Sequence, residues 1–215
     1  QASRIYLVGS EINRDNAVVG YMINNAREIE KIPIESVTIL ENSKLTHKVD
    51  KEFVIKSYYH FVKAVNHYLV KKGLQNALFI KDQCADFDTY KKELLKEDYE
   101  SLVKESGICC KECLEEFAEN YNNELNAIIV FSEKEISANT CLELFNLAMI
   151  TGKLGKTANG LISLKEKNNS QGLFDMGNSS KNGIGNIPIA DPAIVSKLKN
   201  IWDTESLPEI NGKFM

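Results

Sequence analysis

Residues 4–40 read RIYLVGSEINRDNAVVGYMINNAREIEKIPIESVTIL, and this stretch decides the fold. The apolar run Arg4–Val8 predicts a buried strand, and residues 37–40 predict a second one. Between them, residues 17–28 predict a helix, which Pro33 cannot continue. The apolar positions at helical spacing that we expect to face the core are Val18, Met22, Ala26 and Ile29. Strand, helix and strand in this order form a βαβ unit, which implies a parallel sheet with ligands at the carboxyl ends of its strands.

The rest of the chain continues this alternation of strands and helices. A run at 53–55 leads to a helix that Ser57 caps, and residues 127–131 (AIIVF) form the clearest strand. Further helices are expected at 111–121, after Ser137, and from Asp191-Pro192 to about Trp202. We therefore expect one α/β domain over residues 1–215, with a charged, helical and peripheral insertion at 74–125.

Composition excludes several classes of protein. The chain has 215 residues, of which 43% are apolar and 26% charged, as is typical of a globular domain. A net charge of −4 without a basic stripe argues against a nucleic-acid partner. No apolar run approaches the roughly 20 residues of a membrane span, so no membrane insertion is expected. The chain begins with Gln1, and we interpret it as a piece of a longer polypeptide.

The five cysteines are interpreted as free thiols in a reducing, cytoplasmic compartment, since their number is odd and their spacing irregular. Cys109, Cys110 and Cys113 form a CCxxC cluster. Structural zinc needs four ligands, usually as two separated pairs, and an iron–sulfur cluster commonly needs four thiolates. Because no second CxxC exists, we expect half-buried thiols within an amphipathic helix and no metal site.

Residues 151–177, TGKLGKTANGLISLKEKNNSQGLFDMG, contain five glycines and few bulky side chains. Such a segment turns tightly or approaches a ligand closely. Its carboxamides Asn168, Asn169 and Gln171 suit the edge of a heterocycle or a phosphate oxygen. The alternative is a surface loop with ordinary turn chemistry. Gly9-Ser10-Glu11 after the first strand is neither a GxGxxG fingerprint nor a P-loop, and no catalytic triad is visible.

This segment and the helix before it resemble the molybdopterin oxidoreductase family, in particular formate dehydrogenase alpha subunits and the large iron–sulfur subunit of NADH–quinone oxidoreductase. The likeness covers nearly the whole chain in the same order. The residues that match the family's motif are Thr151-Gly152, Gly155, Asn168-Asn169, Gln171-Gly172 and Asp175-Met176-Gly177.

The resemblance implies a Rossmann-like parallel sheet flanked by helices that holds one arm of a molybdopterin guanine dinucleotide. It assigns cofactor contacts to the first strand's tip, to the acidic position after the second strand, to a turn after the third, and to the glycine-rich segment. These positions are Gly9, Ser10, Glu11, Glu41, Lys56, Gly152, Lys167, Asn168, Asn169 and Gln171. Lys165 takes the place of the family's arginine near the metal.

The resemblance also implies that iron–sulfur clusters and the metal-ligating residue belong to missing parts of the parent chain. Its expected partners are other domains of the parent oxidoreductase and electron-transfer subunits. We expect no turnover from the fragment alone.

Several positions depart from the family pattern, and the sequence therefore leaves two functions open. Lys165 cannot reproduce an arginine's bidentate fork, and Glu166 adds a negative charge where a glycine is usual. Residues 56–60 replace a Pro-Gly turn, and the 127–131 strand ends in SEKEIS instead of a glycine-rich turn. Either the domain holds the dinucleotide and supports electron transfer, or it is a structural domain of an NADH dehydrogenase-type complex that has lost the cofactor.

Overall fold

The computed structural model describes residues 2–9, 11–41, 48–165, 167, 169–178, 182–183, 185, 187–188 and 191–206. The chain divides into two compact units, Gln1–Leu164 and Lys165–Met215. The expected single domain over residues 1–215 stays a prediction.

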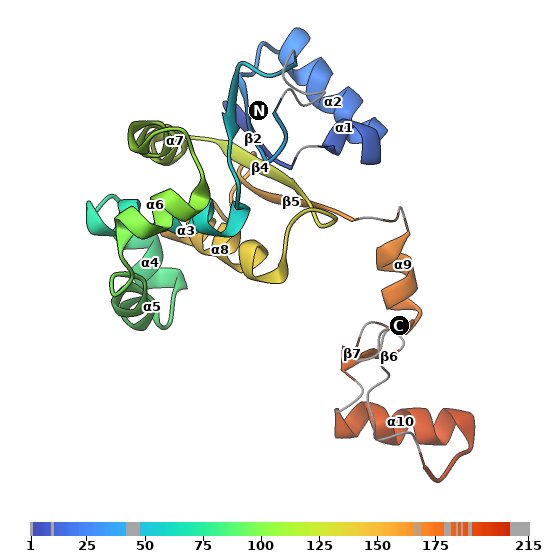
Figure 1. Ribbon diagram of the computed structural model, residues 1–215. Coiled ribbons are helices and arrows are strands. Elements are labelled where there is room, and N and C mark those ends of the chain that lie inside the picture. The colour runs from blue at the N-terminus through green and yellow to red at the C-terminus, as the bar shows by residue number, and fades with distance from the viewer. Residues whose placement is uncertain are drawn as a thin grey trace. The chain divides into compact units, whose positions relative to one another are not determined.

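The first unit is built on a parallel sheet with α1 and α2 on one side and α3, α6, α7 and α8 on the other (Figure 1). The sheet has five strands in the order β3-β2-β1-β4-β5. Its strands are β1 (Arg4–Val8), β2 (Ile34–Thr38), β3 (Lys51–Val54), β4 (Ala127–Ser132) and β5 (Gly160–Leu164). The expected α/β architecture is therefore confirmed. Strand β5 was not expected, because its residues GLISL lie inside the stretch interpreted as a glycine-rich loop. It pairs with β4 through partners such as Ile129 and Leu161.

The central strand β1 supplies side chains to two separate apolar cores, one on each face of the sheet. Tyr6 and Val8 belong to the larger core, whereas Ile5 and Leu7 belong to the smaller one. This alternation follows from the two-residue repeat of a strand. The unit is thus a three-layer α/β/α sandwich, as expected for a parallel sheet buried on both faces.

The smaller core lies under α1 (Ile12–Asp15) and α2 (Ala17–Glu28). The bounds expected for α2 are confirmed; of the four residues expected to face the core, Ala26 does so, and the expectation is wrong for the other three. Ile23 is buried and Val19 and Ala26 pack against it, whereas Val18, Met22 and Ile29 are 74%, 63% and 70% exposed. Helix α2 carries two apolar stripes at helical spacing, and only packing against the sheet selects one of them.

The larger core lies under α3 (Tyr58–Lys71), α6 (Tyr99–Ser106), α7 (Lys111–Asn123) and α8 (Ala138–Ile150). Ser57 caps α3 by accepting a hydrogen bond from the His60 N–H (3.4 Å), and Ser137 caps α8 by accepting one from the Thr140 N–H (3.2 Å). Both caps confirm the sequence prediction.

The expected insertion at 74–125 is helical and contains α4 (Ala77–Gln83), α5 (Phe87–Leu94), α6 and α7. It is not confined to the rim, because α6 and α7 pack on α3 and contribute to the larger core. The buried side chains that it supplies include Leu94, Tyr99, Leu102, Leu114, Phe117 and Tyr121.

The second unit contains α9 (Ser170–Asp175), α10 (Pro192–Trp202) and an antiparallel pair formed by β6 (Asn182–Gly183) and β7 (Ile187–Pro188). Asp191 caps α10 by accepting a hydrogen bond from the Ala193 N–H (3.0 Å), as expected. Neither α9 nor α10 has a buried residue. In the part of the chain that the structure describes, no helix combines the length and apolar character needed to span a bilayer.

Candidate functional site

The residues expected at the strand tips of the first unit lie along one edge of the sheet. Gly9 follows β1, Glu41 follows β2 and Lys56 follows β3, and all three strands run in the same direction. In the order β3-β2-β1-β4-β5, the strand order reverses direction between β1 and β4. Ligands of doubly wound folds bind at the carboxyl edge beside such a reversal. The β1 tip, with Gly9 and Glu11, is at this point.

Gly9 has a backbone conformation that side chains rarely adopt, with φ of +135°. Its N–H donates a hydrogen bond to the Val37 carbonyl (3.1 Å) at the end of β2. A Cβ at this position would lie 3.5 Å from a Glu135 carboxylate oxygen and 3.6 Å from the Ser132 Cβ. Glycine therefore suits this tip because of its backbone angle, since a Cβ would make only ordinary contact with the residues after β4.

The Glu135 carboxylate occupies the reversal point between β1 and β4. One of its oxygens accepts a hydrogen bond from the Glu11 N–H (3.0 Å), and the other accepts one from the Tyr58 hydroxyl (3.0 Å). Glu135 comes from the loop after β4, and Tyr58 from the first turn of α3. An anionic group of the protein itself thus meets the backbone N–H of the β1 tip.

Other charged groups around the β1 tip have partners as well. The Lys134 ammonium lies 3.0 Å from the Asp15 carboxylate, and the Glu11 carboxylate lies 3.3 Å from the Arg14 guanidinium. Both cations are therefore paired with carboxylates of this region.

Lys56 is exposed, and its backbone N–H donates to the Ser106 carbonyl (2.7 Å) at the end of α6. A Cβ on Gly107 would overlap the Lys56 side chain, so this side chain lies against the α6 terminus. Residues 57–60 continue directly into α3, as expected from the loss of the family's Pro-Gly turn.

The two predicted contact carboxamides that the structure describes, Asn169 and Gln171, lie at the start of α9. Asn169 is its N-cap, although its side chain makes no capping hydrogen bond, and the Gln171 carboxamide donates to the Asp175 carboxylate (2.8 Å). A Cβ on Gly172 would overlap the Asn169 carboxamide. The stretch expected as a loop therefore contains a short helix. The Lys167 carbonyl accepts from the Ser170 N–H (3.2 Å), and Lys165 directly follows β5. Ser10, Asn168 and Glu166 lie outside the described residues.

Gly152 is not at the edge that carries the β1 tip. It follows α8, which starts after the carboxyl end of β4 and ends before the amino end of β5. With φ of +68°, Gly152 ends the helix, and the following Lys153 N–H donates to the Ala148 carbonyl (2.8 Å). This glycine is explained by a helix stop against α4, so its position gives no support to the expected cofactor contact, which stays a prediction.

Sequence reasoning missed Glu135 and Tyr58 as members of this site. The signal available was the acidic SEKEIS segment after β4, which departs from the family pattern.

A second buried polar group was also missed. The Glu143 carboxylate accepts hydrogen bonds from the Asn66 carboxamide (2.8 Å) and the Tyr90 hydroxyl (3.0 Å). Burial and this carboxylate raise the pKa of Tyr90. Tyr90 also lines a cavity of about 260 Å³ between α4, α5 and α8.

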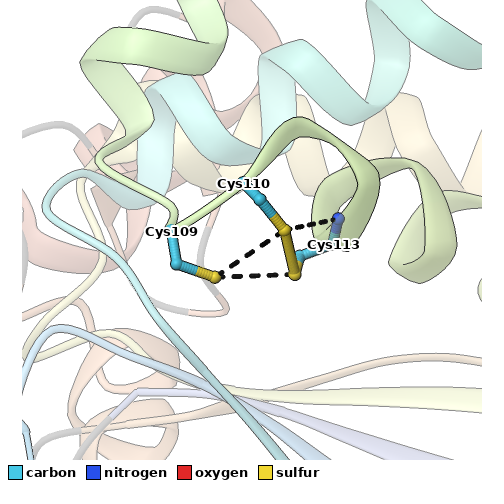
Figure 2. Close-up of side chains that lie close together, drawn as sticks. All are labelled: Cys109, Cys110 and Cys113. Atoms are coloured by element: carbon cyan, nitrogen blue, oxygen red, sulfur yellow. Dashed lines mark hydrogen bonds between the residues drawn. A yellow bond between two sulfur atoms is a disulfide. The ribbon is translucent and has the colours of Figure 1, made fainter.

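Cys84, Cys109 and Cys141 are outside any disulfide, as expected, whereas the expectation is wrong for Cys110 and Cys113, which form a disulfide (Figure 2). Cys109 and Cys110 also precede α7, which begins at Lys111. The disulfide follows from the geometry of the helix start, because the N-cap residue Cys110 and the third helical residue Cys113 have their side chains next to each other.

Known proteins similar to this chain include several formate dehydrogenases. Formate dehydrogenase H of Escherichia coli is 27% identical over 201 residues, which are 91% of this chain and 28% of that protein. The F420-dependent formate dehydrogenase 1 subunit alpha of Methanococcus maripaludis is 34% identical over 118 residues, which are 53% of this chain and 17% of that protein.

The chain is related to the formate dehydrogenases of the molybdopterin oxidoreductase family. Among solved structures, the acetylene hydratase from Pelobacter acetylenicus shares the fold, with a TM-score of 0.57 and 13% identity over 74% of this chain and 23% of that chain. No protein-family model matches the chain. The chain spans less than a third of the length of these relatives, and they give no support to the NADH-linked alternative.

The molybdenum–pterin cofactor of this family can be tested against the described edge. Glu41 is exposed after β2, and a carboxylate there can accept hydrogen bonds from a ribose or a guanine. At the β1 tip, however, the Glu11 N–H is bonded to the Glu135 carboxylate. With Glu135 in this place, the Glu11 N–H is not available to a phosphate oxygen.

Proposed function

We propose that this chain is the domain of a formate dehydrogenase-type molybdopterin oxidoreductase that holds the nucleotide end of a molybdopterin guanine dinucleotide. The observation that carries the proposal is the position of Gly9, Glu11 and Glu41 along one carboxyl edge, beside the reversal of strand order. The relationship to formate dehydrogenases over most of the chain supports it.

Within this proposal, Glu41 accepts hydrogen bonds from the guanosine, and the backbone of the β1 tip approaches the diphosphate. Glu135 must first release the Glu11 N–H, because two anions cannot share one donor in a partly buried site. In the second unit, Lys167, Asn168, Asn169 and Gln171 are proposed as cofactor contacts and Lys165 as the cation near the metal. Gly152 is proposed as a contact from the resemblance alone.

Formate oxidation and electron transfer are proposed for the parent protein, not for this chain alone. The iron–sulfur clusters and the metal ligand would come from other domains, and electron-transfer subunits would be its partners. The relatives are three times the length of the region they share with this chain or more, which is consistent with such a division.

A second candidate function is a structural domain of such an oxidoreductase that no longer binds the cofactor. The observation that favours it is the Glu135 carboxylate, which bonds to the N–H of Glu11 and the hydroxyl of Tyr58. In this function the internal carboxylate permanently replaces the phosphate and stabilises the β1 and β4 tips.

Binding of guanosine diphosphate to the full chain, measured by calorimetry, separates the two functions. Under the first proposal the wild type binds the nucleotide and Glu41→Gln binds it more weakly. Glu135→Ala should bind it at least about tenfold more tightly, because the variant lacks the carboxylate that repels the diphosphate. At a partly buried site this repulsion is worth about 1.4 kcal/mol or more. Glu133→Gln removes a charge from the same loop and serves as the control with unchanged affinity. If neither the wild type nor Glu135→Ala binds the nucleotide, the structural function holds instead.

A further inference from the structure

Three sulfur atoms converge beside the N-terminus of α7 (Figure 2). The Cys109 sulfur lies 3.5 Å from the Cys113 sulfur and 3.9 Å from the Cys110 sulfur. Cys110 and Cys113 are joined by the disulfide. Cys109 is exposed and the other two are half-buried, so small solutes reach all three.

The chain holds the three cysteines in place through two short, anchored segments. Gly107, with φ of +69°, ends α6, and the Ser106 hydroxyl accepts a hydrogen bond from the Ile108 N–H (3.3 Å). This turn carries Cys109 to the start of α7. Cys110 is the N-cap of α7, where its sulfur accepts a hydrogen bond from the Cys113 N–H (3.3 Å). The positive end of the helix dipole stabilises negative charge on sulfur at this position.

The chemistry of the cluster selects one class of ligand. In the described part of the chain, the group consists of cysteines alone, and the nearby Lys111 ammonium is paired with the Glu100 carboxylate. Thiolates bind zinc and other soft or borderline cations and discriminate against magnesium and calcium, which prefer oxygen. An iron–sulfur cluster commonly requires four thiolates, and only three sulfurs converge.

We propose that Cys109, Cys110 and Cys113 bind one Zn²⁺ ion when the disulfide is reduced. A cellular dithiol supplies two electrons and two protons: the Cys110–Cys113 bond becomes two thiols, and the dithiol becomes a disulfide. Zinc then displaces the thiol protons and takes three thiolate ligands, with water or a further ligand in the fourth position. The disulfide is the metal-free, oxidised state of the same site.

A zinc site at these three cysteines was not expected from the sequence, which predicted no metal site. That expectation rested on the absence of a second CxxC pair. The structure adds that Cys109, which precedes the helix, has its sulfur within 4 Å of both other sulfurs.

Titration of the full chain with Co²⁺, a spectroscopic substitute for zinc, tests the proposal. The chain is reduced with a phosphine, freed of reductant under nitrogen, and titrated while the thiolate-to-cobalt charge-transfer absorption is recorded. We expect saturation at one Co²⁺ per chain, displacement by Zn²⁺, and no absorption from the oxidised chain.

Variants identify the ligands. Cys109→Ser should weaken binding by at least about tenfold, because loss of even an outer partner of a metal ligand typically costs about 10–100-fold. The double variant Cys84→Ser/Cys141→Ser removes the two other free thiols and should bind like the wild type. Circular dichroism confirms that each variant is folded. The proposal is overturned if reduced wild type shows no charge-transfer absorption, if Cys109→Ser binds as tightly as wild type, or if the double variant loses the band.

Discussion

Gly152 and Gly155 have almost the same backbone conformation, with φ of 68° and 70°, but different surroundings. A Cβ on Gly155 would meet nothing within 4 Å, whereas one on Gly152 would lie 2.7 Å from the Asn76 carboxamide nitrogen and 3.2 Å from the Phe79 Cβ. We expect Gly155→Ala to cost about 1–2 kcal/mol through its left-handed backbone alone. Gly152→Ala should cost about 1–3 kcal/mol more, because α4 must also move. Denaturant unfolding measures both, and equal losses would show that α4 does not restrain this turn.

We expect His67 to make the stability of the protein depend on pH. It is buried and stacks on Tyr99, and burial together with the neighbouring Lys71 lowers its pKa below the usual value. The unfolded chain therefore binds a proton more readily than the folded one. Stability should rise with pH through the interval that ends near 6.5, and should be lost as the pH falls below it.

Unfolding at a series of pH values between 5 and 8 measures this effect. The variant His67→Phe keeps the ring beside Tyr99 and removes the titrating group, so its stability should fall less than that of the wild type as the pH decreases. Identical slopes for the two proteins would exclude His67 as the source.

At the scale of elements, α2 offers a direct comparison between its two apolar stripes. Ile23 is 8% exposed against the sheet, whereas the adjacent residue Met22, about 100° further around the helix, is 63% exposed. We expect Ile23→Ala to destabilise the chain by about 2–4 kcal/mol. Met22→Ala should change stability by less than about 0.5 kcal/mol. Thermal unfolding of both variants shows which stripe is buried. A larger loss of stability from Met22→Ala than from Ile23→Ala would mean that the stripe with Met22 faces the sheet.

Most elements were predictable from the sequence because their signals are local. The apolar run of β1, the Ser57 and Ser137 caps and the Asp191-Pro192 helix start all act within a few residues. Strand β5 was not predictable in the same way, since its residues GLISL lie between glycines and carboxamides that are typical of a loop. Its strand conformation depends on hydrogen bonds to β4, which lies some 30 residues earlier in the chain.

At the scale of the whole molecule, both apolar cores consist of residues up to Leu164. We therefore expect a chain that ends at Lys165 to unfold cooperatively, with a free energy of unfolding within about 1 kcal/mol of that of the full chain. Denaturant unfolding followed by circular dichroism compares the two. Loss of a cooperative transition in the shorter chain would mean that the first unit needs residues beyond β5.

The sequence by itself determined the α/β class, the βαβ start and the relationship to formate dehydrogenases, because periodicity, caps and motifs are carried by neighbouring residues. Only the tertiary structure decided what stands at the β1 tip and which stripe of α2 is buried. The Glu135 carboxylate reaches Glu11 across 124 residues of chain and Tyr58 across 77. Contacts of that separation depend on how the layers pack, and no local pattern records them. The cysteines differ from this case: Cys109, Cys110 and Cys113 lie within five residues, and the local geometry at the start of α7 brings their sulfurs together.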